Sequence, residues 1–371
     1  MNILIFSWRG PGHPNFGGAE ISTHEHAKGW VKSGHEVTLF TSIYKGGKEE
    51  EIVDGVRIIR SGSQVLGVHW EAFKWYLFKN RQKFDLVIDQ FHGIPFFTPL
   101  YVREKKLGFI HEVTKEVWKL NPWPKPFNLL PYVFGTFFEP LVFSLLYKNI
   151  PFMTVSNSTK KDLEEWGIKS QNIFIVHNGV SSKFIKNFKD KEKRTTITYL
   201  GAISRDKGIE DALKVFALLK QKNNNFQFWV IGKSDVNYLS FLNEKIKKLN
   251  IKDDIRIWGY VSEDKKDNLL SRSHLLINPS IREGWGLVVI EAARVGTPSV
   301  GYDVAGLRDS IVNGKTGILC KPNPKDCSEE IFSLINNKRK YNMLRENCIK
   351  WGNGFSWEKS VDQSLNVLKR I

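Results

Sequence analysis

The order of apolar runs along the chain is the feature that most restricts its fold. Short apolar runs, typical of buried parallel strands, alternate with helical stretches such as residues 19–33 and 157–166. In the first half the predicted strands are 3–6, 36–40, 56–59, 85–89, 107–111 and 152–156. Repetition of strand, helix and strand predicts an α/β domain built on a parallel sheet.

A polar stretch interrupts this alternation, which then starts again. Residues 181–194, SSKFIKNFKDKEKR, are largely charged or polar and predict a linker between domains. A chain of 371 residues also exceeds the usual size of one hydrophobic core. The second series of predicted strands is 196–201, 226–232, 255–260, 274–280 and 298–303.

We therefore predict two doubly wound domains that face each other across a central cleft, where the carboxyl ends of the strands would bind ligands. The predicted bounds are 1–180 for the first domain, 181–195 for the linker, 196–354 for the second domain, and 355–371 for a C-terminal helix that packs back on the first domain.

The formal net charge of +16 is spread along the whole chain. Residues 1–200 hold 27 Lys and Arg against 19 Asp and Glu, and residues 201–371 hold 28 against 20. An even excess favours a generally anion-attracting surface over a nucleic-acid-binding arm, so we predict no nucleic-acid partner. The three cysteines lack CxxC spacing, which indicates neither a disulfide framework nor a zinc site and favours a cytoplasmic location.

The segment 126–147, PFNLLPYVFGTFFEPLVFSLLY, is long enough to span a bilayer. Pro131, Gly135, Glu139 and Pro140 interrupt it. We therefore predict a buried or membrane-lying helix pair in preference to a transmembrane helix.

Two other segments, 69–83 and 115–125, interleave Trp with Lys and Arg. Such segments can lie on an anionic membrane surface, which would attach the protein peripherally. The alternative is that Trp70, Phe73 and Leu77 form a core stripe beneath a solvated basic face. Both interpretations stay open.

The stretch 280–296, SIREGWGLVVIEAARVG, places two carboxylates beside glycines and an apolar run. Glu283 lies in the loop that leaves a predicted strand, and glycines in such a loop present backbone N–H groups that favour anions. Glu291 falls in the second turn of the helix that follows. A carboxylate there needs a partner. It either pairs with Arg294 at i+3 or accepts hydrogen bonds from two neighbouring hydroxyls, as on a ribose.

Taken with other motifs, the Glu283-x7-Glu291 spacing resembles the signature of the retaining glycosyltransferases of family 4, which have the GT-B fold. The resemblance extends almost from end to end. The matching motifs are GGAE (17–20), GHEVTLFT (34–41), FDLVIDQFHG (84–93), FIHE (109–112), VSNSTKKDL (155–163), HNGV (177–180), LGAISRDKG (200–208) and FSWEKSVDQSL (355–365).

The resemblance implies transfer of a sugar, with retention, from a nucleotide-sugar donor to a glycan or lipid-linked glycan acceptor. It implies that Glu283 contacts hydroxyls of the donor sugar, Glu291 holds the ribose and Lys207 binds the diphosphate. His111 matches the family histidine beside the reacting sugar, and His92 is a weaker candidate. The other implied donor-binding residues are Gly17, Gly18, Asn178, Gly284, Trp285, Gly286 and Leu287.

One departure concerns the diphosphate. The family usually has Arg directly after the glycine that ends this strand, whereas here Ala202 follows Gly201. We expect Arg205 to supply the missing cation.

Lys207, Arg205 and the N–H groups after Glu283 would stabilise the leaving diphosphate electrostatically, in place of a metal. No cofactor or metal is therefore expected, and front-face displacement is favoured, with His111 orienting the sugar. Rival functions are a nucleotide-sugar 2-epimerase of the same fold, an inactive sugar-nucleotide sensor and a nucleic-acid-binding protein. No G-x-G-x-x-G motif supports a dinucleotide oxidoreductase.

Overall fold

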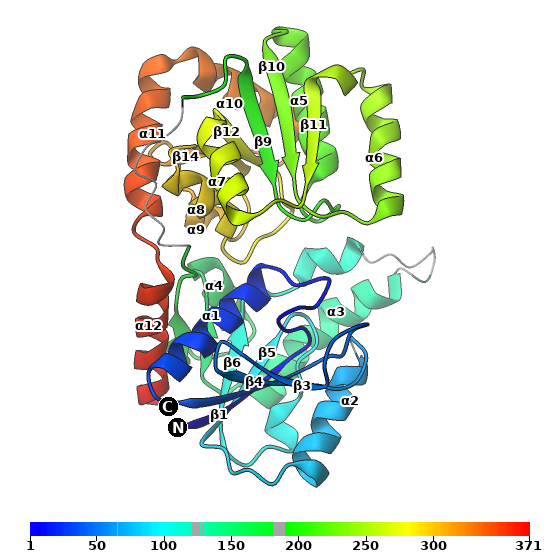
Figure 1. The fold of residues 1–371 in the computed structure, drawn as a ribbon, viewed down its shortest axis with the longest axis vertical. Helices are drawn as coiled ribbons and strands as arrows, with labels where there is room; N and C mark the ends of the chain where they lie inside the picture. The colour runs from blue at the N-terminus through cyan, green and yellow to red at the C-terminus, as the bar shows by residue number, and fades with distance from the viewer. Residues whose placement is uncertain (65, 121–126, 128, 181–189) are drawn as a thin grey trace. The chain divides into compact units, whose positions relative to one another are not determined.

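The computed structural model describes residues 1–64, 66–120, 127, 129–180 and 190–371, and the chain divides into two compact units (Figure 1). The first unit consists of Met1–Gly179 and Ser356–Ile371, and the second of Val180–Phe355. Most of the predicted linker, residues 181–189, lies outside the described residues.

The first unit is built on an eight-stranded sheet of order β3-β4-β2-β1-β5-β6-β7-β8. All neighbouring strands are parallel except β3 and β4. Ile3, Leu4, Ile5 and Phe6 are all fully buried, so both faces of the central strand β1 are covered. The strands are β1 (Asn2–Ser7), β2 (Glu36–Thr41), β3 (Glu50–Val53), β4 (Val56–Arg60), β5 (Leu86–Phe91), β6 (Lys105–Ile110), β7 (Phe152–Thr154) and β8 (Ile173–Ile175).

Helices connect these strands. A side chain caps the start of α4, where the Ser156 Oγ accepts a hydrogen bond from Thr159 N. The helical elements are α1 (Gly18–Lys32), α2 (Leu66–Lys74), η1 (Trp75–Lys79), η2 (Thr98–Leu100), η3 (Lys115–Leu120), α3 (Leu129–Val142), η4 (Phe143–Tyr147), α4 (Asn157–Glu165), η5 (Ser170–Asn172) and α12 (Trp357–Arg370).

The C-terminal helix α12 packs against α1 in the first unit, beside the N-terminus of the chain (Figure 1). The two helices approach closely at Gly29, where an added Cβ would lie 2.4 Å from the side chain of Val361. Trp30 Nε1 donates a hydrogen bond of 2.8 Å to the Ser364 Oγ, and His26 Nδ1 lies 3.0 Å from the same oxygen. The residues after 355 therefore complete the first unit.

The second unit holds a parallel six-stranded sheet of order β11-β10-β9-β12-β13-β14. On β12, Leu275 and Ile277 pack into one core cluster and Leu276 into another, so helices cover both faces. The strands are β9 (Thr195–Leu200), β10 (Phe226–Ile231), β11 (Ile255–Gly259), β12 (Leu275–Asn278), β13 (Ser299–Tyr302) and β14 (Gly317–Cys320). The helical elements are α5 (Ile209–Lys222), α6 (Val236–Lys248), η6 (Lys252–Asp254), α7 (Glu263–Arg272), α8 (Leu287–Arg294), α9 (Leu307–Ser310), α10 (Pro324–Asn336) and α11 (Lys338–Gly352).

The segment 126–147 differs from its prediction. It is neither a pair of helices nor buried: α3 runs without a break into η4, and Pro140 lies inside α3. Among the described residues, Leu129–Tyr147 has the length and composition of a membrane-spanning helix, with a mean hydropathy of 1.6 and 17% of its most apolar window buried. Residues 126 and 128 lie outside the described residues.

The core-stripe interpretation of residues 69–83 is wrong for two of its three residues. Trp70 and Leu77 are exposed, by 60% and 43%. Val68 and Ala72 form the buried face of α2 instead, and η1, which contains Leu77, has no buried residue. Phe73 is half-buried and packs on Tyr101, with ring centroids 5.1 Å apart. In the second basic segment, 115–120 forms η3, and 121–125 lies outside the described residues.

Candidate functional site

In the second unit, two loops that leave the carboxyl ends of neighbouring strands are held against each other. The strands are β9 and β12, which pair in parallel. Ile281 N donates a hydrogen bond of 3.0 Å to Asp206 O. Gly208 has a φ of +71°, and an added Cβ there would lie 1.9 Å from Pro279 O. Only glycine allows this approach, which brings the β9–α5 loop onto the β12–α8 loop.

The approach places Lys207 against Glu283. Lys207 Nζ lies 3.0 Å from Glu283 Oε2, and Ser280 Oγ lies 2.8 Å from Glu283 Oε1. The two charged side chains keep 25% and 14% of their surface exposed, so a ligand can reach both. A lysine and a carboxylate at adjoining strand ends can bind a phosphate and a sugar hydroxyl of one ligand.

A third loop supports the backbone of Glu283. Its N–H donates a hydrogen bond of 3.1 Å to Ala305 O. Gly306 has a φ of +79°, and an added Cβ would lie 2.0 Å from Glu283 O. The position of Glu283 therefore depends on the β13–α9 loop as well as on its own.

Helix α8 begins directly after the glycine-containing loop, as predicted. Gly286 is its N-cap with a φ of +77°, and Leu287 is its first residue. Gly284 is buried beside Glu283, and Trp285 is only 3% exposed because its ring packs edge-on against Phe355. The N-terminus of α8, the positive end of its dipole, thus lies beside Glu283 and favours binding of an anion at this position. The Trp285 ring is buried against Phe355.

Glu291 has a partner other than the predicted one. Its Oε1 lies 2.6 Å from Lys266 Nζ, on α7, while Arg294 Nη2 lies 2.6 Å from Asp267 Oδ2. The predicted pairing of Glu291 with Arg294 is therefore wrong: α7 and α8 are joined by two cross-pairs. Burial raises the pKa of Glu291, and Lys266 opposes that rise.

Arg205 lies in the same loop as Lys207 but is turned toward α5 and α6. Its Nε lies 3.4 Å from Glu210 Oε1, and its guanidinium lies 6.0 Å from the centre of the Tyr238 ring. The side chain is 64% exposed. Its predicted contact with a diphosphate stays a prediction.

Two residues that contact the glutamates of this site, Ser280 and Lys266, were not predicted from the sequence. Ser280 is the last residue of the NPS motif after β12, and its position in the glutamate loop was an available signal. Lys266 gave no local signal, because it lies 25 residues before Glu291 on a different helix.

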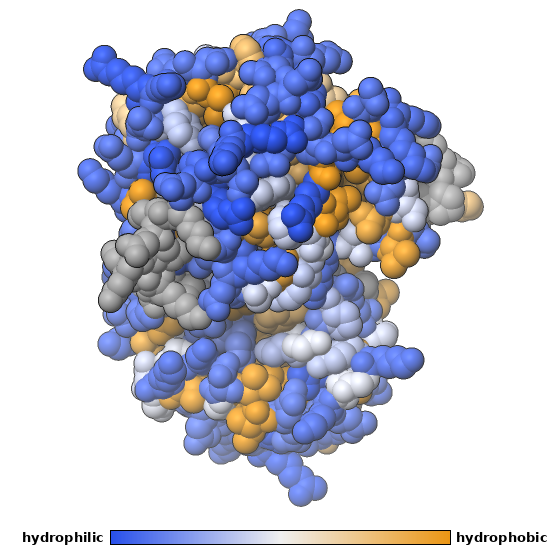
Figure 2. Space-filling view, turned by 45° about the horizontal axis from the view of Figure 1, so that its top comes forward, coloured by the Kyte–Doolittle hydropathy of each residue, from blue (hydrophilic) through white to orange (hydrophobic). Residues whose placement is uncertain are grey.

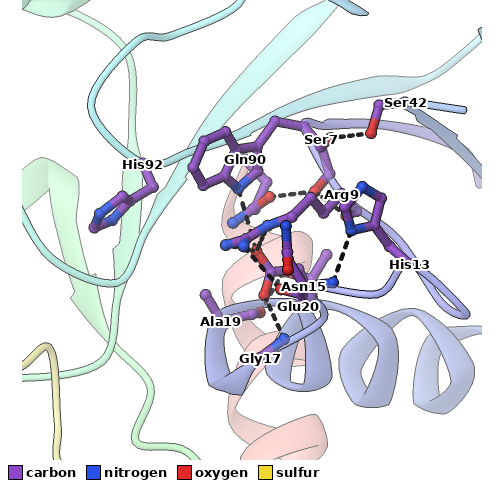
Figure 3. A network of polar contacts seen from close by, with 12 residues as sticks. Ser7, Arg9, His13, Asn15, Gly17, Ala19, Glu20, Ser42, Gln90 and His92 are labelled. Atoms are coloured by element: carbon purple, nitrogen blue, oxygen red, sulfur yellow. Dashed lines mark hydrogen bonds and ion pairs between the residues drawn. The ribbon is translucent and has the colours of Figure 1, made fainter. Parts of the chain in front are cut away.

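The first unit contains a second polar cluster, at the carboxyl end of β1. Figure 3 shows the loop between β1 and α1 gathered around Glu20, which is 2% exposed. Glu20 Oε1 lies 2.8 Å from Arg9 Nη2, and its Oε2 accepts a hydrogen bond of 2.8 Å from Gly17 N. Trp8 Nε1 donates to the same carboxylate at 3.2 Å. Through these contacts Glu20 holds the β1–α1 loop in place, in addition to any favourable interaction with the dipole of α1.

His111 follows β6 directly and is 6% exposed. Among the described residues neither ring nitrogen has a hydrogen-bond partner, whereas its carbonyl accepts a 2.9 Å bond from the Thr159 Oγ1. Burial, with smaller contributions from His26 and His92, lowers the pKa of His111 to about 3. The ring is thus neutral at physiological pH, and its two nitrogens are buried.

The remaining candidates also belong to the first unit. His92 stacks on Trp8, with ring centroids 6.0 Å apart. Asn178 Oδ1 accepts a 2.6 Å hydrogen bond from the Ser22 Oγ on α1. An added Cβ at Gly18 would meet nothing within 4 Å, so backbone approach is open there. The predicted residues thus form two sets. The first unit holds Gly17, Gly18, His92, His111 and Asn178, and the second unit holds the others.

No group of three or more His, Cys, Asp or Glu side chains is placed to hold a metal ion in the described part of the chain. The expectation of a metal-free reaction stays a prediction.

Comparisons with known proteins assign the class of protein. The model of the glycosyl transferases group 1 matches residues 181–351, and that of Glycosyltransferase Family 4 matches residues 16–184. Together they span residues 16–351, which include most of both units. The chain belongs to this family of glycosyltransferases and has its GT-B fold of two Rossmann-like domains, as predicted.

Individual relatives agree with this assignment. Uncharacterised glycosyltransferase MJ1607 of Methanocaldococcus jannaschii is 22% identical over 100% of this chain and 98% of its own. MJ1178 of the same organism is 30% identical, over 56% of each chain. Among solved structures, sucrose-phosphate synthase from Thermosynechococcus elongatus has a TM-score of 0.82 at 18% identity, over 100% of this chain and 98% of that one. Anabaena HepE, solved with UDP and glucose, has a TM-score of 0.74 at 15% identity, over 100% of both.

Proposed function

We propose that this glycosyltransferase moves a hexosyl group, with retention and without a metal, from a nucleotide sugar to a glycan or lipid-linked glycan in the cytoplasm. The observation that carries the proposal is the contact of Lys207 with Glu283 at the carboxyl ends of β9 and β12, where Nζ and Oε2 are 3.0 Å apart. This contact places the Lys207 ammonium, which can bind phosphate, beside the Glu283 carboxylate, which can bind sugar hydroxyls.

The donor is assigned to the second unit. Lys207 binds the diphosphate, and the start of α8 adds backbone N–H groups and a favourable dipole. Glu283 accepts hydrogen bonds from hydroxyls of the transferred sugar. Glu291 accepts bonds from the ribose, and Lys266 holds its carboxylate in place through a 2.6 Å contact.

The chemistry rests on stabilising the departing diphosphate. As the bond between the anomeric carbon and the phosphate oxygen breaks, negative charge grows on the diphosphate and is met by Lys207 and the α8 amides. The acceptor hydroxyl forms its bond to the same face of the sugar and passes its proton to the departing phosphate oxygen. His111, neutral because burial lowers its pKa to about 3, orients the sugar by hydrogen bonding.

The first experiment is a thermal-shift screen with UDP-, GDP- and ADP-sugars, because a ligand that binds the native state raises the Tm. UDP-glucose comes first, since the structural relative HepE is solved with UDP and glucose. The proposal expects a Tm rise with one nucleotide class and a loss of that rise in Lys207→Ala. A Tm unaffected by all three classes contradicts it.

A product assay then tests the reaction itself. With the selected donor, the proposal expects sugar transfer that requires an acceptor, persists in EDTA and keeps the anomeric configuration in the NMR spectrum of the product. Conversion of the donor without an acceptor would instead identify a 2-epimerase. Loss of activity in EDTA, or an inverted product, would contradict the mechanism.

A further inference from the structure

Helix α3 and its continuation η4 present apolar side chains to solvent and a carboxylate to the interior. Gly135, Glu139, Phe143 and Tyr147 form the buried stripe at four-residue spacing. The outward-facing apolar residues are all 48% or more exposed: Leu129, Leu130, Val133, Phe134, Phe137, Phe138, Leu141 and Leu145. An ordinary surface helix turns its apolar side to the core. Here Phe143 and Tyr147 do so, but most of the apolar side chains lie on the outer face while Glu139 is buried.

Specific contacts fix this orientation. Glu139 Oε2 accepts a 2.9 Å hydrogen bond from Trp118 Nε1, and its Oε1 accepts a 3.2 Å bond from Thr114 N. Trp118 also packs directly on Gly135, where an added Cβ would lie within 2.4 Å of the indole. Turning the helix over would expose Glu139 but would break both bonds and the Trp118–Gly135 contact. The apolar face is therefore held outward by the fold.

Such a surface requires an explanation, because monomeric soluble proteins seldom expose large contiguous apolar patches. The molecule is otherwise mostly hydrophilic on the face shown in Figure 2, where apolar side chains gather in separate patches. A long face of Phe and Leu in water is an aggregation risk unless something covers it.

Charge indicates which kind of partner covers it. The chain carries a net charge of +16, so a second copy would be repelled and an anionic surface attracted. Lys119 lies at the edge of α3, with its Nζ 4.9 Å from the centre of the Tyr132 ring, and exposed Lys148 follows η4 directly. An apolar face bordered by lysines is the pattern of helices that lie in the interface of an anionic bilayer.

We propose that α3 and η4 form a membrane-docking surface that lies along an anionic bilayer, with its outward Phe and Leu side chains among the upper acyl chains and Lys119 and Lys148 among the headgroups. The helix does not span the membrane, because its Gly135–Tyr147 stripe stays packed on the first unit. This docking goes beyond the proposed function and requires neither donor nor catalysis.

Vesicle sedimentation of the full chain tests the proposal. The wild type is expected to bind phosphatidylglycerol–phosphatidylcholine vesicles, more strongly at low salt than at high salt, and pure phosphatidylcholine weakly. The variant Phe134→Ser/Phe137→Ser is expected to lower the partition coefficient at least about tenfold, because it removes two aromatic side chains that the proposal places in the bilayer.

The matched control is Ile52→Ser, at a side chain of the same unit that is 75% exposed and lies on edge strand β3. It is expected to bind vesicles like the wild type, and circular dichroism checks that both variants fold. No wild-type binding at low salt overturns the proposal, as does equal binding by the double variant. A concentration-dependent dimer that the double variant abolishes, without vesicle binding, would identify a second copy as the occupant instead.

Discussion

Lys207 and Glu283 lie 76 residues apart in the sequence, yet Lys207 Nζ is 3.0 Å from Glu283 Oε2. Three features create this proximity: the parallel pairing of β9 with β12, the hydrogen bond from Ile281 N to Asp206 O, and the close approach of Gly208 to Pro279. The geometry is thus set by the backbone of two loops, which explains how the charged side chains stay together without being deeply buried.

The Gly208 approach leads to the first prediction. Gly208→Ala places a Cβ 1.9 Å from Pro279 O at a φ of +71°, so the two loops must separate. We expect a loss of about 2–4 kcal/mol of unfolding free energy in urea titrations, and weaker donor binding.

Gly314→Ala is the control, because its φ is +72° but an added Cβ would meet nothing within 4 Å. It carries only the left-handed strain, which costs about 1 kcal/mol. Equal losses in the two variants would show that the contact with Pro279 is unimportant.

The Lys266–Glu291 pair leads to the second prediction. Lys266→Met leaves the carboxylate of Glu291 without its 2.6 Å partner in a setting where burial already raises its pKa. We expect a loss of about 3 kcal/mol in unfolding free energy. The double variant Lys266→Met/Glu291→Gln should regain most of the stability but not the affinity for nucleotide. If the double variant also regains the affinity, Glu291 does not hold the ribose.

Glu139 leads to a prediction about pH. Burial raises the pKa of Glu139 to about 7, opposed by its hydrogen bonds from Trp118 and Thr114. The folded state therefore favours the protonated carboxyl, and its contribution to stability is lost as the pH rises from about 4.5 through about 7. Glu139→Gln, which keeps a neutral acceptor, should gain up to about 3 kcal/mol relative to the wild type between pH 5 and pH 8.

Chemical denaturation at several pH values measures this difference. His26 and His111 also titrate with folding, since burial lowers the pKa of each to about 3. Their contribution is lost as the pH falls from about 6.5 and is the same in both proteins, so it cancels in the comparison. A difference that does not change with pH would mean that Glu139 is ionised in the folded state.

Local patterns in the sequence were enough to predict most of the alternating strands and the start of α8 near Gly286. The roles of Glu283 and Glu291 in binding the donor stay predictions. The missed strands were those with weak patterns: β3 reads EEIV and is an antiparallel edge strand, and β8 and β14 are short. The partners of Glu291 and Glu139 were missed because Lys266 and Trp118 lie on other helices. Such contacts depend on tertiary packing, and no spacing rule within one helix encodes them.

The orientation of α3 shows the same limit. Its composition predicted an apolar helix, and the interruptions at Pro140 and Glu139 suggested two. The helix stays continuous through Pro140, and Glu139 forms its buried anchor instead of a break. The sequence alone does not show whether an acidic residue in an apolar helix interrupts the helix or, like Glu139, is buried and hydrogen-bonded to the rest of the fold.

The assignment of the donor site is tested most directly by the affinity of Lys207→Ala for the nucleoside diphosphate that the donor screen selects. Isothermal titration calorimetry measures this affinity, and Lys214→Ala is the control. Lys214 is a matched lysine on α5, 48% exposed and paired with Asp211 at 2.8 Å. A charged hydrogen bond to phosphate is worth about 1.5–3 kcal/mol, so Lys207→Ala should weaken binding at least about tenfold. Lys214→Ala should bind like the wild type. Unchanged affinity in Lys207→Ala would contradict the assignment of the donor site.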